Sequence, residues 1–251
     1  MKVSVCIPMY NESAIIEKTA KTLTEALDAR FRDDYELLFS DDGSTDGSAE
    51  RVRALNLPRV RVVGYAQNRG KGCAVRTAML EAAGDVILFT DADLAYGTDV
   101  IGQAVDAFAA NPDCDLVIGS RNLGKDGYEG YTVLRKIASK IYIRVLCMVG
   151  GFRLSDSQCG CKAFTNRAAK EIFKRCETDG FAFDFEALMW AEQLGYHIAE
   201  MPVRVINHRE SKIRLLRDTV RMLRDLSRIK RRVKRTVRSE KPDSEKQKKT
   251  I

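Results

Sequence analysis

The sequence of 251 residues lacks the features that mark several large classes of protein. No stretch of about 18 consecutive apolar residues is present, which excludes an ordinary membrane-spanning helix. Met1 is followed almost at once by the apolar run at residues 3–7, so we expect neither a secretion signal nor a membrane span. Histidine occurs only twice and the seven cysteines are scattered, so we expect neither a zinc site nor a disulfide framework, and the thiols are read as structural.

Basic and acidic residues are unevenly distributed along the chain. The net charge is +7, but residues 204–251 contain 18 Lys and Arg against 6 Asp and Glu, a balance of +12. Residues 1–203 contain 24 against 29, a balance of −5. Between residues 212 and 238, arginines and apolar residues each recur three and four positions apart on separate faces. We therefore expect one folded domain at 1–211, a basic amphipathic helix at 212–238 and a disordered polar tail at 239–251.

Apolar runs alternate with amphipathic stretches through the first 120 residues. The runs, which are rich in β-branched residues, lie at 3–9, 35–40, 60–65, 85–90 and 115–119, and one more expected strand covers 197–203. This alternation predicts an α/β fold in which helices flank both faces of a mostly parallel sheet. At residues 133–152 apolar positions three or four apart are interrupted by basic residues, which predicts an amphipathic interface helix within the domain.

Polar residues follow the expected strands, at the edge where open parallel sheets bind ligands. They are Tyr10, Asn11 and Glu12 after the first strand, Asp41 and Asp42 at the second, and Asp91 and Asp93 after the fourth. Each cluster alone could simply cap a helix. Together, however, the carboxylates would repel one another unless a cation offset their charge. Asp91 and Asp93 offer the hard oxygen ligands that Mg²⁺ or Mn²⁺ prefers.

The segment 68–72 looks at first like a phosphate-binding loop, because glycine and lysine precede a helix. It lacks the strict Gly-x-x-x-x-Gly-Lys-Ser/Thr pattern, and no glycine follows the first strand, where a dinucleotide fingerprint would begin. Both absences disfavour a P-loop nucleotidase and an NAD-dependent enzyme.

Five motifs occur in the order and spacing found in the family 2 glycosyltransferases, which have the GT-A fold. They are Pro8-x-Tyr10-Asn11-Glu12, Asp41-Asp42-Gly43-Ser44-x-Asp46-Gly47, Asn68-x-Gly70-Lys71-Gly72, Asp91-x-Asp93 and Gly119-Ser120-Arg121. Segments 156–164, 183–186 and 208–212 resemble more narrowly the polyprenyl-phosphate branch, especially dolichyl-phosphate glucosyltransferases and their mannose-synthase relatives. The resemblance covers about residues 2–215.

The resemblance implies a role for each of these residues. Those implied to bind the nucleotide sugar, of UDP-glucose or GDP-mannose type, are Pro8, Tyr10, Asn11, Glu12, Asp41, Asp42, Lys71, Asp91, Arg209 and Lys212. Asp91 and Asp93 would bind the Mg²⁺ or Mn²⁺ that bridges the donor diphosphate and offsets the charge of the leaving nucleotide. Asp91, Asp93 and Arg121 form the implied catalytic set.

The acceptor decides between two branches of this family. A sugar hydroxyl needs a carboxylate base, whereas a lipid phosphate is already anionic and mainly needs cations. Arg121, Arg135 and Ser139 match the acceptor-phosphate positions, and the Gln-x-x-Arg-Trp motif of polymerising relatives is absent. We expect inverting transfer of a hexose, with glucose suggested by segment 156–162, to a polyprenyl phosphate. For the alternative acceptor, a glycan or glycolipid hydroxyl, Asp156 or Asp184 would be the base.

Without a spanning helix, lipid access would require peripheral attachment to the cytoplasmic face of the membrane. The helix at 133–149 and the C-terminal helix would supply apolar side chains, and the arginines would meet anionic lipid. Packing of the C-terminal helix on the body or on a second subunit is an equal alternative near Lys212, and the surface role is favoured beyond Ser227. A nonenzymatic module that holds nucleic acid is the alternative of another class, and the absence of aromatic residues among the arginines argues against nucleic acid as a partner.

Overall fold

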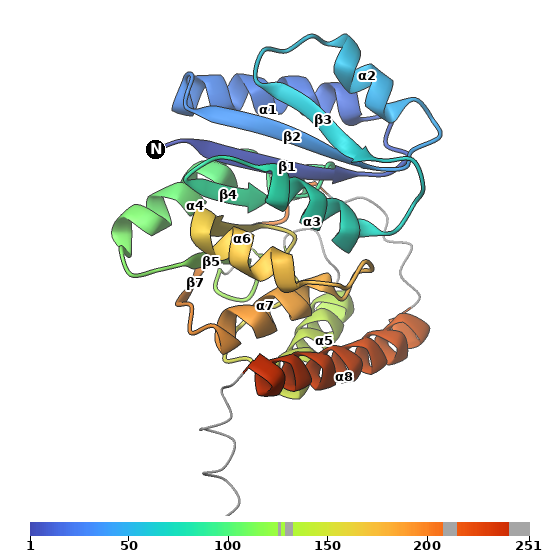
Figure 1. The fold of residues 1–251 in the computed structure, drawn as a ribbon, viewed down its shortest axis with the longest axis vertical. Helices are drawn as coiled ribbons and strands as arrows, with labels where there is room; N and C mark the ends of the chain where they lie inside the picture. The colour runs from blue at the N-terminus through green and yellow to red at the C-terminus, as the bar shows by residue number, and fades with distance from the viewer. Residues whose placement is uncertain (125–126, 129–132, 208–214, 241–251) are drawn as a thin grey trace, which may run out of the picture.

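The computed structural model describes residues 1–124, 127–128, 133–207 and 215–240 (Figure 1). Its centre is a seven-stranded sheet with the strand order β3-β2-β1-β4-β6-β5-β7. The strands are β1 (Val3–Met9), β2 (Tyr35–Asp42), β3 (Val60–Tyr65), β4 (Val86–Phe89), β5 (Leu116–Ser120), β6 (Lys162–Thr165) and β7 (Ile198–Pro202). β6 runs antiparallel to both neighbours and every other pair is parallel.

Helices cover both faces of the sheet, as the alternating pattern predicts. They are α1 (Ile16–Phe31), α2 (Ser48–Ala54), α3 (Lys71–Glu81), α4 (Asp99–Ala110), α5 (Val133–Gly150), α6 (Asn166–Arg175), α7 (Phe183–Gln193) and α8 (Leu215–Glu240). Successive residues of a strand point to opposite faces, so Leu37 and Phe39 join the core under α1, α2 and α4, while Leu38 joins the core under α3, α6 and α7. The second core continues into α5 and α8.

All six strands expected from the apolar runs are present, and β6 is an addition. Only two apolar residues lie within β6, so the four-residue segment carries no strand pattern of its own. Its first residue, Lys162, pairs with Phe89 of β4 and with Ile118 of β5. Because β6 is antiparallel, its beginning lies at the same sheet edge as the ends of β1, β2, β4 and β5, and it adds Lys162 to the polar residues gathered there.

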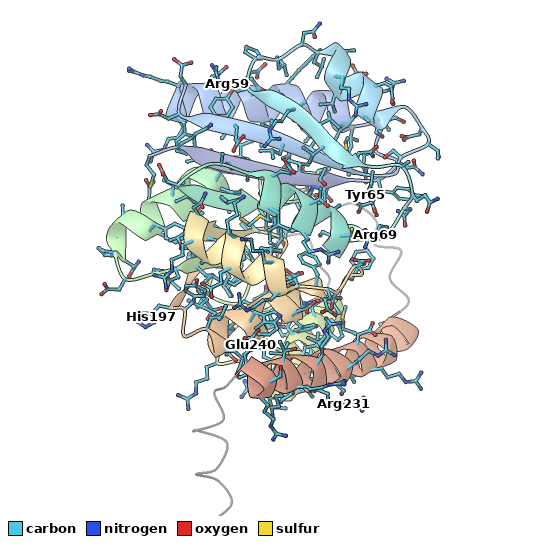
Figure 2. All side chains as sticks on the ribbon, in the orientation of Figure 1. Arg59, Tyr65, Arg69, His197, Arg231 and Glu240 are labelled. Carbon is cyan, nitrogen blue, oxygen red and sulfur yellow. The ribbon has the colours of Figure 1, made fainter. Side chains whose placement is uncertain are left out.

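α8 corrects one expectation about the C-terminal helix. Leu226, Ile229 and Val233 are buried in the core shared with α5 and α7, so the surface role expected for the apolar face beyond Ser227 is wrong for Ile229 and Val233. The described arginines of the stripe, at positions 224, 228, 231, 235 and 238, remain exposed, and Figure 2 shows Arg231 on the outer side of the helix. Among the described residues, no helix is long and apolar enough to cross a bilayer.

Candidate active site

The loops that follow β1 and β2 are tied together at the carboxyl edge of the sheet. Asn11 has a left-handed φ of 53°, and its side-chain oxygen accepts a hydrogen bond of 2.9 Å from the amide of Thr45. Its own amide donates to Ser44 Oγ over 3.0 Å. The neighbouring Glu12 amide donates to Ser48 Oγ over 2.9 Å. Since Met9 is paired with Asp41 in the parallel register, the structure brings residues 8–12 and Asp41 into one corner, as expected.

Asp42 lies in a different environment from its neighbour Asp41. Its side chain is buried and accepts hydrogen bonds from the Tyr65 hydroxyl (2.7 Å), the Asn68 amide side chain (2.8 Å) and the backbone amides of Arg69 (2.8 Å) and Gly70 (2.9 Å). The carboxylate therefore anchors the 68–70 loop.

The beginning of α3 is occupied by the protein's own backbone. The amides of Gly72 and Cys73 donate to the carbonyl of Asp179 over 2.7 and 3.2 Å. A Cβ on Gly72 would lie 2.4 Å from the Thr178 carbonyl oxygen, and one on Gly70 would lie 2.5 Å from that of Asp179. The glycines that give this segment the look of a phosphate loop are thus required by segment 178–180, which agrees with the missing P-loop pattern.

Asp91 follows β4 and forms an ion pair with Lys71, whose Nζ lies 2.5 Å from Asp91 Oδ1. Burial favours the neutral amine of Lys71, but the charges of Asp91 and Asp184 outweigh it and raise the pKa of Lys71. Backbone of Gly160 faces the other carboxylate oxygen, since a Cβ at Gly160 would lie 2.2 Å from Asp91 Oδ2. Only glycine therefore fits at position 160 while Asp91 keeps this position.

Asp91 and Asp93 suit a hard divalent cation whose remaining ligands come from a phosphate. Asp93 Oδ1 accepts a hydrogen bond of 3.1 Å from the Ala95 amide, which fixes the carboxylate on the turn after β4. Both acids are partly exposed. No group of three or more His, Cys, Asp or Glu side chains in the described part of the chain could hold a metal. Mg²⁺ sites commonly combine one or two carboxylates with substrate phosphates, and the donor set here suits that arrangement.

Arg121 follows β5 and is bound to a buried acid. Its Nε and Nη2 donate to the two oxygens of Asp156 over 2.6 and 3.0 Å. Burial alone would lower the pKa of Arg121, but the hydrogen bonds and charge of Asp156 raise it above its usual range. The Arg121 guanidinium and Lys140 Nζ of α5 each lie 5.8 Å from the ring centroid of Tyr128, so this ring connects α5 with the end of β5.

A second buried ion pair lies behind Asp91. Lys162 Nζ is 2.7 Å from Asp184 Oδ1 and donates to the Cys159 carbonyl over 2.7 Å. Burial raises the pKa of Asp184 despite the adjacent ammonium. Asp156 and Asp184, the two alternative bases, are therefore both bound to an internal cation.

Three expected residues cannot be compared with their predicted roles. Arg209 and Lys212 lie outside the described residues, as does the side chain of Arg135 on α5. Ser139, four positions later, is half-buried.

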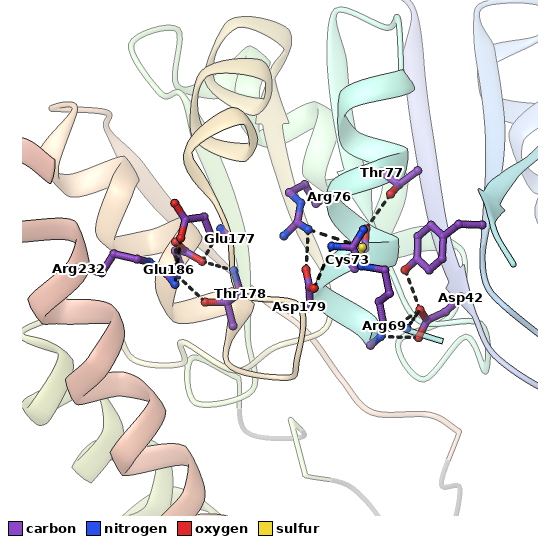
Figure 3. A network of polar contacts seen from close by, with 12 residues as sticks. Asp42, Arg69, Cys73, Arg76, Thr77, Glu177, Thr178, Asp179, Glu186 and Arg232 are labelled. Atoms are coloured by element: carbon purple, nitrogen blue, oxygen red, sulfur yellow. Dashed lines mark hydrogen bonds and ion pairs between the residues drawn. The ribbon is translucent and has the colours of Figure 1, made fainter. Parts of the chain in front are cut away.

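Sequence reasoning assigned no role to three acids that support the site. Glu200 of β7 accepts hydrogen bonds from Ser155 and from the Asp156 amide. Asp179 and Glu186 hold the segment between α6 and α7, as shown in Figure 3. A glutamate inside the short strand β7 and the acid pair at 184 and 186 are the only signals that could have drawn attention to them.

Comparison with known proteins identifies the family. Residues 4–173 match the family described as Glycosyl transferase family 2. The chain belongs to this family. It is 32% identical over 215 residues to the dolichyl-phosphate beta-glucosyltransferase of Dictyostelium discoideum, which covers 80% of the chain and 65% of that protein. The corresponding enzymes of Saccharomyces cerevisiae and Homo sapiens are each 30% identical, over 86% and 84% of the chain and 70% and 69% of their own lengths. The chain thus spans about two thirds of these relatives.

Solved structures confirm the GT-A fold. Glucosyl-3-phosphoglycerate synthase from Mycobacterium tuberculosis, in complex with Mn²⁺, UDP and phosphoglyceric acid, superposes with a TM-score of 0.70 at 22% identity, over 97% of this chain and 80% of that one. Mannosyl-3-phosphoglycerate synthase from Rubrobacter xylanophilus gives 0.66 at 20% identity, over 96% and 76%. At these identities the likeness concerns the fold alone.

Proposed function

We propose that this family member transfers glucose from UDP-glucose to a polyprenyl phosphate, with inversion at the anomeric carbon and with Mg²⁺ or Mn²⁺. One observation favours a phosphate acceptor over a hydroxyl: both alternative bases are bound in internal ion pairs. Asp156 and Asp184 are buried and already bind Arg121 and Lys162, so neither carboxylate is placed to take a proton from an acceptor hydroxyl. An anionic phosphate needs no base. The dolichyl-phosphate glucosyltransferase relatives support the same acceptor class.

In this proposal each group of residues at the sheet edge has a separate binding role. Residues 8–12 and Asp41 bind the nucleoside, and Asp91 and Asp93 hold the cation that offsets charge on the leaving UDP. Lys71 forms an ion pair with Asp91, and its ammonium would also contact the donor diphosphate when the nucleotide sugar binds. Asp42 acts indirectly, since its oxygens hold the 68–70 loop. Arg121, with Arg135 and Ser139 of α5, orients the acceptor phosphate.

The deciding assay combines the protein with Mn²⁺ or Mg²⁺, a panel of UDP- and GDP-sugars, and a short polyprenyl phosphate. Release of UDP together with a glucosylated lipid is expected only with UDP-glucose. The matching polyprenol, which lacks the phosphate, serves as the control and should not react. Turnover of the polyprenol or of a glycan instead would favour the hydroxyl-acceptor alternative and refute the phosphate assignment.

Asp93→Ala provides a test of the metal assignment within the same assay. The variant should lose transfer while its unfolding temperature stays near that of the unchanged protein, because Asp93 is partly exposed and lies on a turn. Asp113→Ala, on the exposed turn before β5, is a matched control and should keep full activity. Retained transfer in Asp93→Ala would contradict the metal role.

Peripheral membrane attachment is the second part of the proposal. Ile137, Ile141 and Met148 of α5 recur at helical spacing and are 51%, 58% and 67% exposed, so α5 presents the apolar face that α8 does not. α5 and α8 lie at the same end of the molecule in Figure 1, and Lys230 Nζ of α8 donates to the Val149 carbonyl of α5 over 3.0 Å. Apolar residues of α5 and arginines of α8 together suit an anionic lipid surface.

Vesicle flotation separates these two contributions. Each basic residue near an anionic surface contributes about 1 kcal/mol, so Arg228→Gln with Arg231→Gln should weaken binding to anionic vesicles by ~30-fold at low salt. Ile141→Glu should weaken binding to neutral and anionic vesicles alike. Arg53→Gln, on the exposed surface of α2, is the matched control. No binding of the unchanged protein to anionic vesicles at low salt would refute the membrane proposal.

A further inference from the structure

The segment between α6 and α7 is held from one side by α8. Glu186 of α7 is fully buried, and its Oε2 accepts hydrogen bonds from the amides of Glu177 (3.0 Å) and Thr178 (2.7 Å). Its Oε1 accepts from Arg232 Nη2 of α8 over 2.6 Å, and the same guanidinium nitrogen donates to Thr178 Oγ1 over 2.9 Å. Arg232 therefore reaches the segment both directly and through Glu186.

On its other side, the segment between α6 and α7 contacts the 68–70 loop and the first turn of α3. The Asp179 carbonyl accepts the amides of Gly72 and Cys73, and the Asp179 carboxylate binds Arg69 (3.1 Å) and Arg76 (2.5 Å). No Cβ fits at Gly70 or Gly72 against this backbone, so the contact is too close to shift without moving the loop. Figure 3 shows the contacts of Arg232 and Glu186 on one side and those of Asp179, Arg69 and Asp42 on the other, joined by the chain between Thr178 and Asp179.

Lys71 lies between the two glycines, at the point where these contacts end. Its backbone is fixed on one side by Asp42, which accepts the amides of residues 69 and 70, and on the other by Asp179, which accepts the amide of residue 72. Its ammonium meets Asp91 at 2.5 Å. The placement of this ammonium beside the proposed metal ligand thus depends on the segment that Glu186 organises.

We infer that Glu186 and Arg232 are positioning residues for Lys71, and that their polar contacts, rather than the apolar packing of α8, connect this helix to the binding of the sugar donor. This inference rests on the proposed function, because it assumes that Lys71 contacts the donor diphosphate. A buried carboxylate that accepts three hydrogen bonds loses at least one of them when it becomes an amide, since a Gln side chain has a single acceptor oxygen. The loss would loosen residues 177–179 and, through the Asp179 carbonyl, the first turn of α3.

Two variants test the inference from opposite ends, Glu186→Gln and Arg232→Gln. Mutations along such contact networks change coupling between sites by about 0.5–2 kcal/mol, so each variant should raise the KM for the nucleotide sugar roughly 2- to 30-fold. The KM for the polyprenyl phosphate should not change. Because the two residues act in series, the double variant should be no worse than the more affected single variant. Arg232 is 28% exposed, so its variant keeps the test usable if Glu186→Gln does not fold.

Two control variants distinguish positioning from general loosening of the fold. The exposed carboxylate of Glu177 lies 3.4 Å from Arg232 Nη1. Glu177→Gln removes this ion pair and should leave the donor KM unchanged. Ile229→Ala destabilises the packing of α8 without touching the polar contacts, and it too should leave the donor KM unchanged. An equal rise of the donor KM in Ile229→Ala would overturn the inference.

Hydrogen exchange provides a readout that does not depend on turnover. The amides of residues 72 and 73, bonded to the Asp179 carbonyl, should exchange faster in Glu186→Gln and Arg232→Gln than in the unchanged protein or in Glu177→Gln. If the unchanged protein turns over no nucleotide sugar, the proposed function fails, and exchange at these amides still tests the structural link. Unchanged exchange together with an unchanged donor KM in both variants would overturn the inference.

Discussion

Lys162→Met is the substitution with the largest expected effect on stability among the polar residues near the site. Lys162 and Asp184 are 0% and 10% exposed, so removal of the ammonium leaves a carboxylate in the interior without its nearest cation. Breaking such a pair typically costs about 3–5 kcal/mol. For a domain of this size each kcal/mol lowers the unfolding temperature by about 2–4 °C. We therefore expect a decrease of roughly 6–20 °C.

Calorimetry or circular dichroism would measure the change, with Arg30→Met as the matched control. Arg30 and Asp106 lie at a similar distance, 2.6 Å, but their side chains are 54% and 63% exposed. An exposed pair contributes about 0–1 kcal/mol, so the control should lose no more than a few degrees. The contrast isolates the effect of burial, because both variants remove one cation from one acid.

The stability lost in Lys162→Met should depend on pH, and the pKa of Asp184 determines the direction of that dependence. Burial raises the pKa of Asp184 above its value in the unfolded chain, and loss of Lys162 removes a charge that opposes this rise. A group with a raised pKa binds its proton more tightly in the folded state, so its contribution to stability is complete below the unfolded pKa and is lost as pH rises through the folded pKa. Lys162→Met should therefore lie closest to the unchanged protein in acid and furthest from it at neutral pH.

A compensating variant completes the test. Replacing both partners, in Lys162→Met with Asp184→Leu, removes the uncompensated charge and should recover most of the lost stability. A loss below about 1 kcal/mol in Lys162→Met, or a double variant as unstable as the single one, would refute the assignment of a buried ion pair that holds β6 to α7.

Three single substitutions test other parts of the site and its support. Burial alone would raise the pKa of Asp179, but Arg76 and Arg69 lower it, so its stabilising effect is present above the unfolded pKa of about 3.9 and is lost as pH falls further. Asp179→Asn should thus flatten the acid limb of the urea-midpoint curve; an unchanged limb would contradict the pairing. Ile229→Ala should cost about 2–5 kcal/mol in urea unfolding, and a cost under 1 kcal/mol would show that α8 is not packed as described. Gly160→Ala should displace the Asp91 carboxylate and weaken Mn²⁺ retained with UDP, measured by electron paramagnetic resonance; wild-type retention would contradict the close approach.

Local patterns were sufficient to predict most of the fold. β1 and β3 run over the residues that their apolar runs indicate, and helices flank both faces of the sheet as the alternating pattern predicts. β6 could not be predicted, because a strand that contains Lys162 is stable in the interior only if an acid lies opposite, and that acid is 22 positions later in α7. Likewise, the spacing of Ile229 and Val233 predicts an apolar face but does not say whether lipid or protein covers it.

The candidate site was predictable in its location but not in its internal pairing. Parallel strands end at one edge, so the order of the motifs was enough to gather Asp41, Asp91 and Asp93. Which acids are held by the protein itself depends on contacts far apart in sequence. Arg121 meets Asp156 35 positions away, and Arg76 meets Asp179 103 positions away.

These pairings change the meaning of the acidic charge at the sheet edge. From the sequence, several converging carboxylates require an added cation. Arg121 and Lys162 do not supply this charge, because they are paired with Asp156 and Asp184. Asp42 is held mainly by neutral donors of its own loop. In the proposed function the need for a divalent ion therefore falls on Asp91 and Asp93, and there Lys71 supplies part of the positive charge. A cation bound by so few acids depends on the donor diphosphate for its remaining ligands, so metal and nucleotide sugar should bind each more tightly when the other is present.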